Sequence, residues 1–484
     1  MQSLIRHPER NSSNILRADI LTEAPASSDP AVGTRGWKKQ WTIRRALLPR
    51  RPNLDWRMEQ DCSLFYRYRS ASSSTPTEQH HAHADDETEG VAGEVEEVVV
   101  VYTPLVGDVS HPKMDVFDAA AVAMGQTPPS EAYIPFYHPK VRALAFHYQP
   151  TTFRPSNSDV GHDDDDDPIF GRMAISLIPF PPSSVFPPTH RLSRVGLSLL
   201  TTLHMHTWGD MHSYQKRVHH DTIIPRSLYQ DLYLSLKGKY ASELIAGWKE
   251  ATDPAKHVFE EMGIAAYLIG LWSLSYACGG TDEGWKHKVK FVDVGCGNGL
   301  LSYILAREGF SGIGLDMRAR KSWAQHTSHA VLREWMFDPS ALPSASSAEW
   351  TGAWLIGNHA DQLTPWLPLL ATHSNAAGFI NLPCCYYALD GTREFPLLLK
   401  AQRAAQVSRN EQYLAYISML HERFAWQVEL DPLRIPSTKN WCFVGRRRLR
   451  VSTEKGDETE VLRERIQECV QEALRGSWAS PASV

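Results

Sequence analysis

The chain has 484 residues, with 50 lysines and arginines against 55 aspartates and glutamates, so its formal net charge is −5. Hydrophobic residues make up 42% and charged residues 22%, which excludes a wholly disordered or fibrous protein. The slight acidic excess requires any nucleic acid to be held by a local basic patch, and the seven scattered cysteines favour a reducing compartment over a disulfide framework.

Residues 1–95 are predicted to be largely disordered. The first twenty residues lack the continuous apolar stretch that a signal peptide needs. The polar run Ser72–Gly90, SSSTPTEQHHAHADDETEG, has too little apolar surface to order itself. We interpret its three histidines as part of a solvated linker and not as a metal site.

The segment 96–215 is predicted to form a small β-rich or mixed α/β module. Glu97–Tyr102 and Met173–Pro179 have the apolar, β-branched character of strands, while Val195–His206 is compatible with a strand or a helix. An acidic insertion near 156–168, which includes Asp163 to Asp167, is predicted to be a solvated loop.

Helical spacing of apolar residues dominates 216–284, which we expect to lead into the catalytic domain. Within it, Met262–Thr281 has no charged residue and is long enough to span a membrane. Its glycines and serines instead favour a helix buried in a protein core. No membrane association is therefore expected.

Short apolar strands alternate with helices over 285–450, which predicts a doubly wound, Rossmann-like α/β domain. TPWLPLLA is interpreted as a helix with a threonine N-cap and proline at its first position. The stretch Phe337–Trp350 shows no clear third strand. Residues 451–484 are expected to form a charged C-terminal helix, Glu458–Leu474, and a tail.

The strongest motif is a glycine-rich turn between the first strand of this domain and its helix, FVDVGCGNGL. Glycines at 295, 297 and 299 let a ligand approach the backbone and the amides at the helix start. Asp293 precedes the turn, and Asp316 ends the next strand, where a carboxylate can accept both ribose hydroxyls of an adenosine. The GxGxG spacing favours S-adenosylmethionine (SAM) over a nicotinamide cofactor, the alternative reading of such a turn.

This combination resembles the class I SAM-dependent methyltransferases. The resemblance implies that Asp293 faces the methionine amino group, that Gly295, Gly297 and Gly299 wrap the amino-acid part, and that Asp316 binds the ribose. We also assign Asn298 and Met317 to the cofactor site.

Longer blocks resemble one family, the tRNA (uracil-2'-O-)-methyltransferases that modify uridine 44 of serine tRNA. They include DVGCGNGLLSYILAREGFSGIGLDMRARKSW, KRVHHDTIIPR, TDPAKHVFEEMGIAAYLIGLW, WLIGNHADQLTPWLP and LRIPSTKNWCFVGR, spread over about 190–450. The resemblance implies a cytoplasmic enzyme that uses SAM to methylate a ribose 2'-hydroxyl of tRNA. The first 190 residues match nothing that we can place.

The candidate catalytic residues follow the fourth strand, where doubly wound folds collect ligands. Asp361 or His359 is the candidate base or orienting group, with Asn358 beside them, although His359 is equally compatible with a structural turn residue. A cysteine nucleophile is disfavoured because a ribose acceptor needs no covalent adduct. Zinc held by Cys384, Cys385, Cys442 and His359 lacks CxxC spacing, so no metal is expected.

Basic residues near the motif are the candidate tRNA contacts. They are Arg318, Arg320, Lys321, Arg434, Lys439, Arg446, Arg447 and Arg448. Trp323 and Trp441 are either core residues or platforms for an unpaired base. Two alternative functions stay open: a methyltransferase of another RNA or of a protein, and a non-catalytic SAM-fold module that binds RNA.

Overall fold

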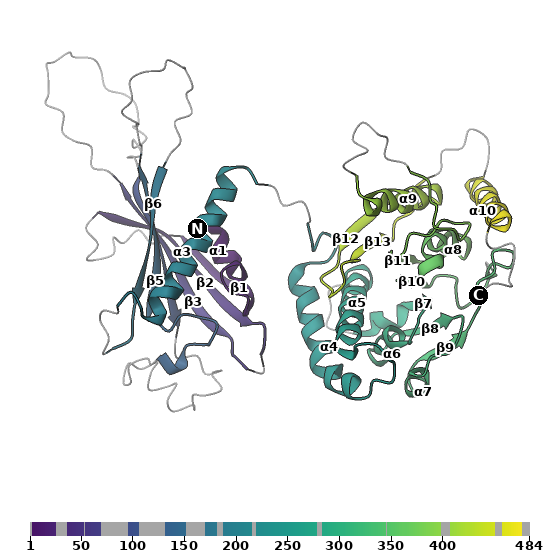
Figure 1. The fold of residues 1–484 in the computed structure, drawn as a ribbon, viewed down its shortest axis with the longest axis horizontal. Helices are drawn as coiled ribbons and strands as arrows, with labels where there is room; N and C mark the ends of the chain where they lie inside the picture. Colours follow the sequence, from purple (N-terminus) through teal and green to yellow (C-terminus); the bar gives the residue numbers. More distant parts are fainter. Residues whose placement is uncertain are drawn as a thin grey trace, which may run out of the picture. The chain divides into compact units, whose positions relative to one another are not determined.

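The computed structural model describes most of the chain, in two compact units, Met1–Gln215 and Lys216–Val484 (Figure 1). The described residues are 2–25, 36–52, 54–68, 95–105, 131–151, 170–181, 187–214, 219–277, 283–344, 346–397, 407–450 and 457–476. The polar run Ser72–Gly90 and the acidic insertion near 156–168 lie outside them.

The first unit is a six-stranded antiparallel sheet in the simple order β1-β2-β3-β4-β5-β6, with a long helix, α3, against it (Figure 1). Its core lies between the sheet and the helix and includes Cys62, Val100, Phe146 and Leu203. The elements are α1 (Gln2–Arg6), η1 (Pro8–Arg10), β1 (Ile15–Pro25), β2 (Trp37–Pro49), β3 (Met58–Tyr68), β4 (Val95–Leu105), η2 (Glu131–Tyr133), β5 (Ala143–Thr151), β6 (Phe170–Ile178) and α3 (Arg191–Met211).

The prediction that 1–95 is largely disordered is wrong, because this segment supplies three full strands of the sheet. β3 alternates strictly between buried and half-buried positions from Met58 to Phe65, as expected of a strand with one face on a core. The outward-facing positions carry charged side chains, so the average composition of the segment is polar although its strands are regular. Arg44 and Asp61, for example, form an ion pair of 2.8 Å across β2 and β3. Val195–His206, left open between strand and helix, lies in the helix α3.

The second unit contains a seven-stranded sheet in the order β12-β13-β11-β10-β7-β8-β9. All its strands are parallel except β13, which runs antiparallel to both β11 and β12. The predicted doubly wound α/β fold is confirmed. The strands are β7 (Lys290–Val294), β8 (Ser311–Asp316), β9 (Val331–Glu334), β10 (Trp354–Asn358), β11 (Gly378–Leu382), β12 (Glu429–Pro432) and β13 (Trp441–Gly445).

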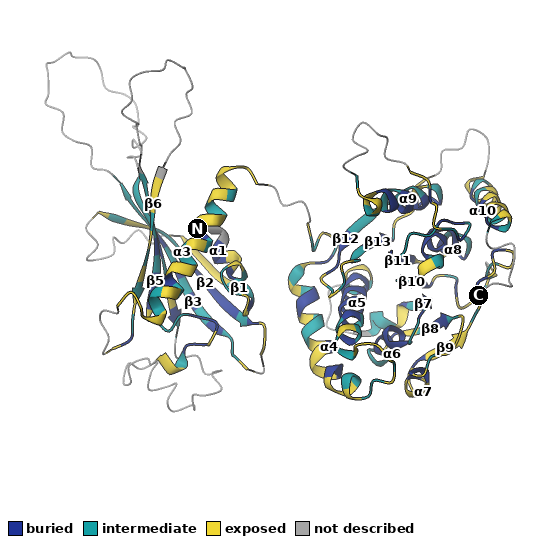
Figure 2. Ribbon diagram, viewed as in Figure 1, coloured by how far each residue is buried: buried dark blue, intermediate teal, exposed yellow. Residues whose placement is uncertain are grey.

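Helices cover both faces of this sheet, so the central strands β7, β10 and β11 are buried almost throughout (Figure 2). Successive residues of β7 enter different cores: Phe291 packs with α4, α5 and α6, whereas Val292 packs with α8, α9 and α10. The helical elements are α4 (Arg226–Ala246), α5 (Pro254–Tyr276), η3 (Glu283–Lys288), α6 (Leu300–Arg307), α7 (Trp323–His326), η4 (Asp361–Trp366), α8 (Leu367–His373), α9 (Arg409–Arg423) and α10 (Glu458–Arg475).

The part of the uncharged stretch from Met262 to Tyr276 lies in α5, the central helix of this core. Met262, Leu268 and Trp272 are fully buried in it. Within the part of the chain that the structure describes, no helix combines the length and hydropathy that a membrane span requires.

As expected from the sequence, no strand lies among the described residues of Phe337–Trp350. The third strand of the α/β pattern is β9, which precedes this stretch and is only four residues long and mostly exposed, so it carries little apolar signal. One local prediction in this unit needs correction. Thr364 lies inside η4 and is no N-cap, because the chain already turns helically at Asp361 and α8 begins at Leu367.

A buried histidine in α9 makes a testable contribution to stability. His421 is fully buried between Phe379 and Phe443, and neither ring nitrogen has a hydrogen-bond partner among the described residues. Burial lowers its pKa to about 3. Below about pH 6.5 the unfolded chain therefore takes up a proton that the folded protein does not. As the pH is lowered through this range, the free energy of unfolding falls by up to about 1.4 kcal/mol per pH unit.

We expect His421→Leu to flatten this dependence between about pH 6 and pH 4 and to raise the free energy of unfolding at neutral pH by about 1 kcal/mol, because two unsatisfied buried polar atoms are removed. Urea unfolding at a series of pH values measures both. An unchanged pH slope would contradict the argument.

Candidate active site

The glycine-rich loop joins β7 to α6, and its three glycines all have the left-handed backbone that other residues adopt rarely. Their φ angles are +80° at Gly295, +53° at Gly297 and +74° at Gly299. A Cβ at Gly299 would approach Leu332 to 2.6 Å, whereas a Cβ at Gly297 would meet nothing within 4 Å. The middle of the loop is thus free on the side where a ligand would approach the backbone.

Asp316, at the end of β8, holds this loop in place. Its Oδ2 accepts a hydrogen bond of 2.8 Å from the amide of Gly297. From the other side, the indole of Trp323 donates to the Gly297 carbonyl at 2.9 Å. Trp323 is 6% exposed, so it is a core residue and no platform for a base.

The other assigned cofactor residues lie at the ends of the same loop. Asn298 accepts the amide of Leu300 at 3.0 Å, so its side chain caps the start of α6. Met317 directly follows Asp316 and is half exposed.

Asp293 lies below the loop and is almost fully buried. Its Oδ2 accepts a hydrogen bond of 2.8 Å from Ser302, while its Oδ1 has no partner among the described residues. Burial raises the pKa of this carboxyl to about 7, and the nearby Asp316 carboxylate adds to the rise. A positively charged group next to Asp293 would lower the pKa of this carboxyl again and would supply a partner for Oδ1.

The helix α5 brings two further carboxylates to the site, which sequence reasoning missed. Asn358 Nδ2 donates to Glu261 Oε2 at 3.0 Å, and His359 Nε2 lies 3.2 Å from Glu260 Oε1. Burial, together with the charges of Asp293 and Glu260, raises the pKa of Glu261 well above its ordinary value. The ends of β7 and β10 and the helix α5 thus bring together buried carboxyl groups whose ionised form a nearby positive charge would favour.

This region is suited to a ligand that carries positive charge. Three buried polar atoms lack a partner among the described residues: Asp293 Oδ1, Asn358 Oδ1 and His359 Nδ1. Unpaired buried groups of this kind require an explanation such as an ordered water or a ligand. SAM, with a sulfonium and an ammonium group, fits the acidic cluster, and its adenosine ribose fits the carboxylate of Asp316.

The structure separates the three candidate catalytic residues into two groups. Asn358 and His359 contact α5, whereas Asp361 accepts a hydrogen bond from the Cys384 thiol at 3.3 Å. His359 and Asp361 both have positive φ, +53° and +46°. Two such residues within three positions are the kind of backbone strain that concentrates at functional sites.

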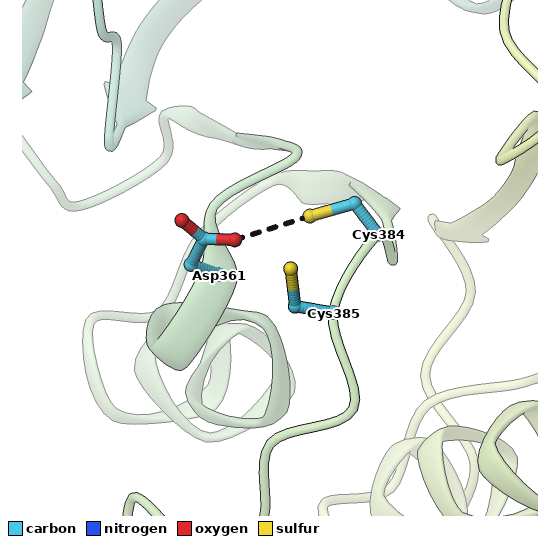
Figure 3. A group of neighbouring side chains, drawn as sticks. All are labelled: Asp361, Cys384 and Cys385. Carbon is cyan, nitrogen blue, oxygen red and sulfur yellow. Dashed lines mark hydrogen bonds between the residues drawn. The ribbon is translucent and has the colours of Figure 1, made fainter. Parts of the chain in front are cut away.

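A cysteine nucleophile and the four-residue zinc set that includes Cys442 and His359 find no support in this arrangement. Burial raises the pKa of both the Cys384 and Cys385 thiols, and the Asp361 carboxylate raises them further, which disfavours a thiolate nucleophile. The zinc set considered from the sequence is not formed, because Cys442 is buried in β13 and His359 is held by Glu260. Cys384 and Cys385 instead face Asp361 (Figure 3).

Four of the eight candidate RNA-contacting cations are engaged within the protein. Arg434 pairs with Asp221 at 2.6 Å, and Arg446 pairs with Glu429 at 2.7 Å. Lys439 donates to Tyr386, and Arg448 lies over the Trp426 ring.

The remaining cations follow the two strands β8 and β13. Arg320 lies 3.9 Å from Asp316, so it borders the cofactor site. For Arg318, Lys321 and Arg447, the described residues include no ion-pair partner within 4.0 Å. Trp441 is half-buried at the start of β13.

The strand order and the loop geometry together define a class I SAM-dependent methyltransferase. In chain order, the seven strands of the second unit lie as 3-2-1-4-5-7-6, with the seventh antiparallel, and the glycine-rich loop follows the first. Family models agree: "TRM44-like, N-terminal bet v1-like domain" matches residues 1–217, and "Predicted AdoMet-dependent methyltransferase" matches residues 223–336.

The chain belongs to the tRNA (uracil-O(2)-)-methyltransferase family. It is 32% identical to the protein of that name from Schizosaccharomyces pombe, over 93% of this chain and 82% of the relative. The Neurospora crassa protein of the same name is also 32% identical, over 93% and 83%. The solved magnesium protoporphyrin IX methyltransferase of Synechocystis PCC 6803, with bound SAH, aligns with a TM-score of 0.25 and 14% identity, covering 46% of this chain and 97% of that chain.

Asp316 offers a direct test of the cofactor site. We expect Asp316→Ala to weaken SAM binding by about 100-fold, because two charge-assisted hydrogen bonds to the ribose hydroxyls would be lost. Asp316→Asn keeps an acceptor for the Gly297 amide and serves as the control for loop geometry. Calorimetric titration with SAM measures the effect, and unchanged affinity in the alanine variant would contradict the assignment.

Proposed function

We propose that this protein transfers the methyl group of SAM to the 2'-hydroxyl of a tRNA uridine, and that its target is uridine 44 of serine tRNA. The single observation that carries the proposal is the acidic cluster of Asp293, Glu260 and Glu261 beside the glycine-rich loop, in a chain of this family. Serine tRNA and position 44 are supported by the sequence resemblance alone.

For this reaction the protein must align the acceptor with the donor and help to remove a proton from the acceptor. SAM supplies a methyl group on a positively charged sulfur, so the donor needs no metal or covalent intermediate to activate it. Alignment of the acceptor oxygen with the methyl carbon and the sulfur supplies much of the rate. The ribose hydroxyl is a weak acid, which makes a well-placed base useful.

His359 is the stronger candidate for the base. Glu260 holds its Nε2 at 3.2 Å, which fixes the orientation of the ring, and its Nδ1 has no partner among the described residues. This pairing of a carboxylate with an imidazole is a recurrent arrangement in general-base catalysis. We assign Asn358 and Asp361 to positioning of the acceptor.

The deciding experiment is methyl transfer from labelled SAM to unmodified serine tRNA, followed by mapping of the labelled nucleotide. We expect 2'-O-methyluridine at position 44. Label at another nucleotide or in another RNA would contradict the proposed target, uridine 44 of serine tRNA, but would support methyl transfer to RNA. Bound SAM without transfer to any RNA would favour a non-catalytic binding module.

We also propose a cytoplasmic location. The six described cysteines are free thiols, which is compatible with a reducing compartment. Imaging of the tagged full-length protein in cells tests this, and confinement to an organelle would contradict it.

A further inference from the structure

A cluster of soft and charged ligand atoms lies at the carboxyl edge of the catalytic sheet, next to the candidate active site. Asp361 opens η4 just after β10, and Cys384 and Cys385 follow β11 by two and three residues. The two strands are hydrogen-bonded neighbours with Asn358 opposite Leu382, so the backbone brings the three side chains together. In Figure 3 both thiols point toward the Asp361 carboxylate.

The spacing of these atoms suits one metal ion. One carboxylate oxygen and the two sulfurs all lie within 4.8 Å of one another, and Cys384 Sγ is 3.3 Å from Asp361 Oδ1. For a tetrahedral zinc with ordinary bond lengths, the oxygen–sulfur separation is about 3.5 Å and the sulfur–sulfur separation about 3.8 Å. Small rotations of the side chains would complete the geometry.

The composition of the cluster favours zinc over other common cations. Two thiolates and one carboxylate are poor ligands for Mg²⁺ or Ca²⁺, which prefer oxygen, but are ordinary ligands for Zn²⁺. Three protein ligands leave the fourth position open, as in zinc sites that bind an exogenous oxygen. Asp361 is exposed and both cysteines are partly exposed, so this position is accessible from solvent.

We propose that Asp361, Cys384 and Cys385 hold one Zn²⁺ ion, and that the open position binds the 2'-hydroxyl oxygen of the acceptor ribose. The second half of this proposal rests on the proposed function. Coordination lowers the pKa of the hydroxyl. Its proton then passes to His359, the oxygen forms a bond to the methyl carbon as the carbon–sulfur bond breaks, and the sulfur keeps the electron pair in the S-adenosylhomocysteine that leaves.

The first test measures metal binding alone. The full-length protein is purified with a non-chelating reductant, loaded with zinc, freed of excess metal and analysed for metal content, with about one ion expected per chain. The variant carrying both Cys384→Ser and Cys385→Ser should lose the ion, and Asp361→Asn should bind it more weakly. Cys469→Ser, in α10, is the control cysteine and should keep it.

Cobalt substitution adds a spectroscopic readout that cysteines acting only in packing would not produce. Co²⁺ bound by thiolates gives a sulfur-to-cobalt charge-transfer band, expected in the wild type and Cys469→Ser but absent from the double serine variant. Equal SAM affinity in all variants shows that they are folded. No zinc in the wild type, or equal zinc in the double variant, would overturn the site.

The second test asks whether methyl transfer depends on the bound zinc. Removal of zinc should reduce methyl transfer at least about 100-fold with SAM affinity unchanged, and added zinc should restore it. Full activity in the zinc-free enzyme would overturn the role of the ion in holding the acceptor. Zinc bound through the three residues without transfer to any tRNA would overturn the proposed function and support the metal site.

Discussion

Replacing Asp293 with asparagine is expected to weaken SAM binding by about 100-fold or more and, at the same time, to stabilise the free protein above neutral pH. In the folded protein, burial raises the pKa of this carboxyl from 3.8 to about 7. The folded state therefore keeps a proton that the unfolded chain loses between about pH 4 and pH 7, and the free energy of unfolding falls as pH rises through this range. The shift of about three units corresponds to roughly 4 kcal/mol as an upper bound.

Asparagine has the size of aspartic acid and no charge, so this loss of stability should vanish in Asp293→Asn. The cationic cofactor would meanwhile lose its buried anionic partner, with an expected fall in affinity of about 100-fold or more. Thermal unfolding at pH 5 and pH 8 and calorimetric titration with SAM measure the two effects.

Asp431→Asn is the matched control for this experiment. Asp431 is also buried, with a raised pKa, but it accepts the Ile223 amide at 3.2 Å and lies in β12, at the edge of the sheet. Its replacement should leave SAM affinity unchanged. A variant of Asp293 that bound SAM normally would exclude the acidic cluster as the cofactor site.

Replacing His359 with alanine is expected to reduce methyl transfer by about 10²- to 10⁴-fold while SAM affinity changes little, because a general base acts on the acceptor and not on the donor. Glu260→Gln should give a smaller loss, about 10-fold, since glutamine can still orient the ring but no longer stabilises its charge. Single-turnover transfer under saturating SAM isolates this step.

The control for this pair is His373→Ala in α8, where the histidine contacts the Pro343 carbonyl. This variant should transfer methyl groups at the wild-type rate. If His359→Ala did so as well, His359 would be excluded as the base.

The glycine-rich loop shows what a sequence can reveal about such a site. Asp293, the three glycines and Asp316 lie on two consecutive strands and the turn between them, so their proximity follows from local chain geometry. Glu260 and Glu261 lie on a helix that precedes the first strand, and no local spacing links them to the loop. Only the packing of α5 against the sheet brings them to the site.

The basic residues illustrate a different limit. The run Arg446–Arg448 has no acidic residue in sequence and so resembled an exposed binding surface. Its pairing partner Glu429 comes from the adjacent strand, and Asp221 reaches Arg434 from a segment more than two hundred residues earlier. Whether a cation is available for RNA depends on such partners, which charge counting does not reveal.

The first unit shows a related limit of sequence-based prediction. A solvent-facing antiparallel sheet places a polar residue at every second position, so average composition resembles that of an unordered chain. Residues Met58–Phe65 show the alternation clearly when read position by position. The polar character of Ser72–Gly90 does not extend to the strands that precede it.

The antiparallel strand β13 has a consequence for how the protein is made. Trp441–Gly445 inserts between β11 and β12, so until the ribosome has synthesised it β12 has no partner in the sheet and β11 is paired on one side only, with β10. The first unit ends at Gln215 and can fold while synthesis continues. A protein chain truncated before Trp441 would therefore contain a folded N-terminal unit and a methyltransferase sheet with unpaired strand edges. Such edges make the truncated protein prone to aggregation and degradation.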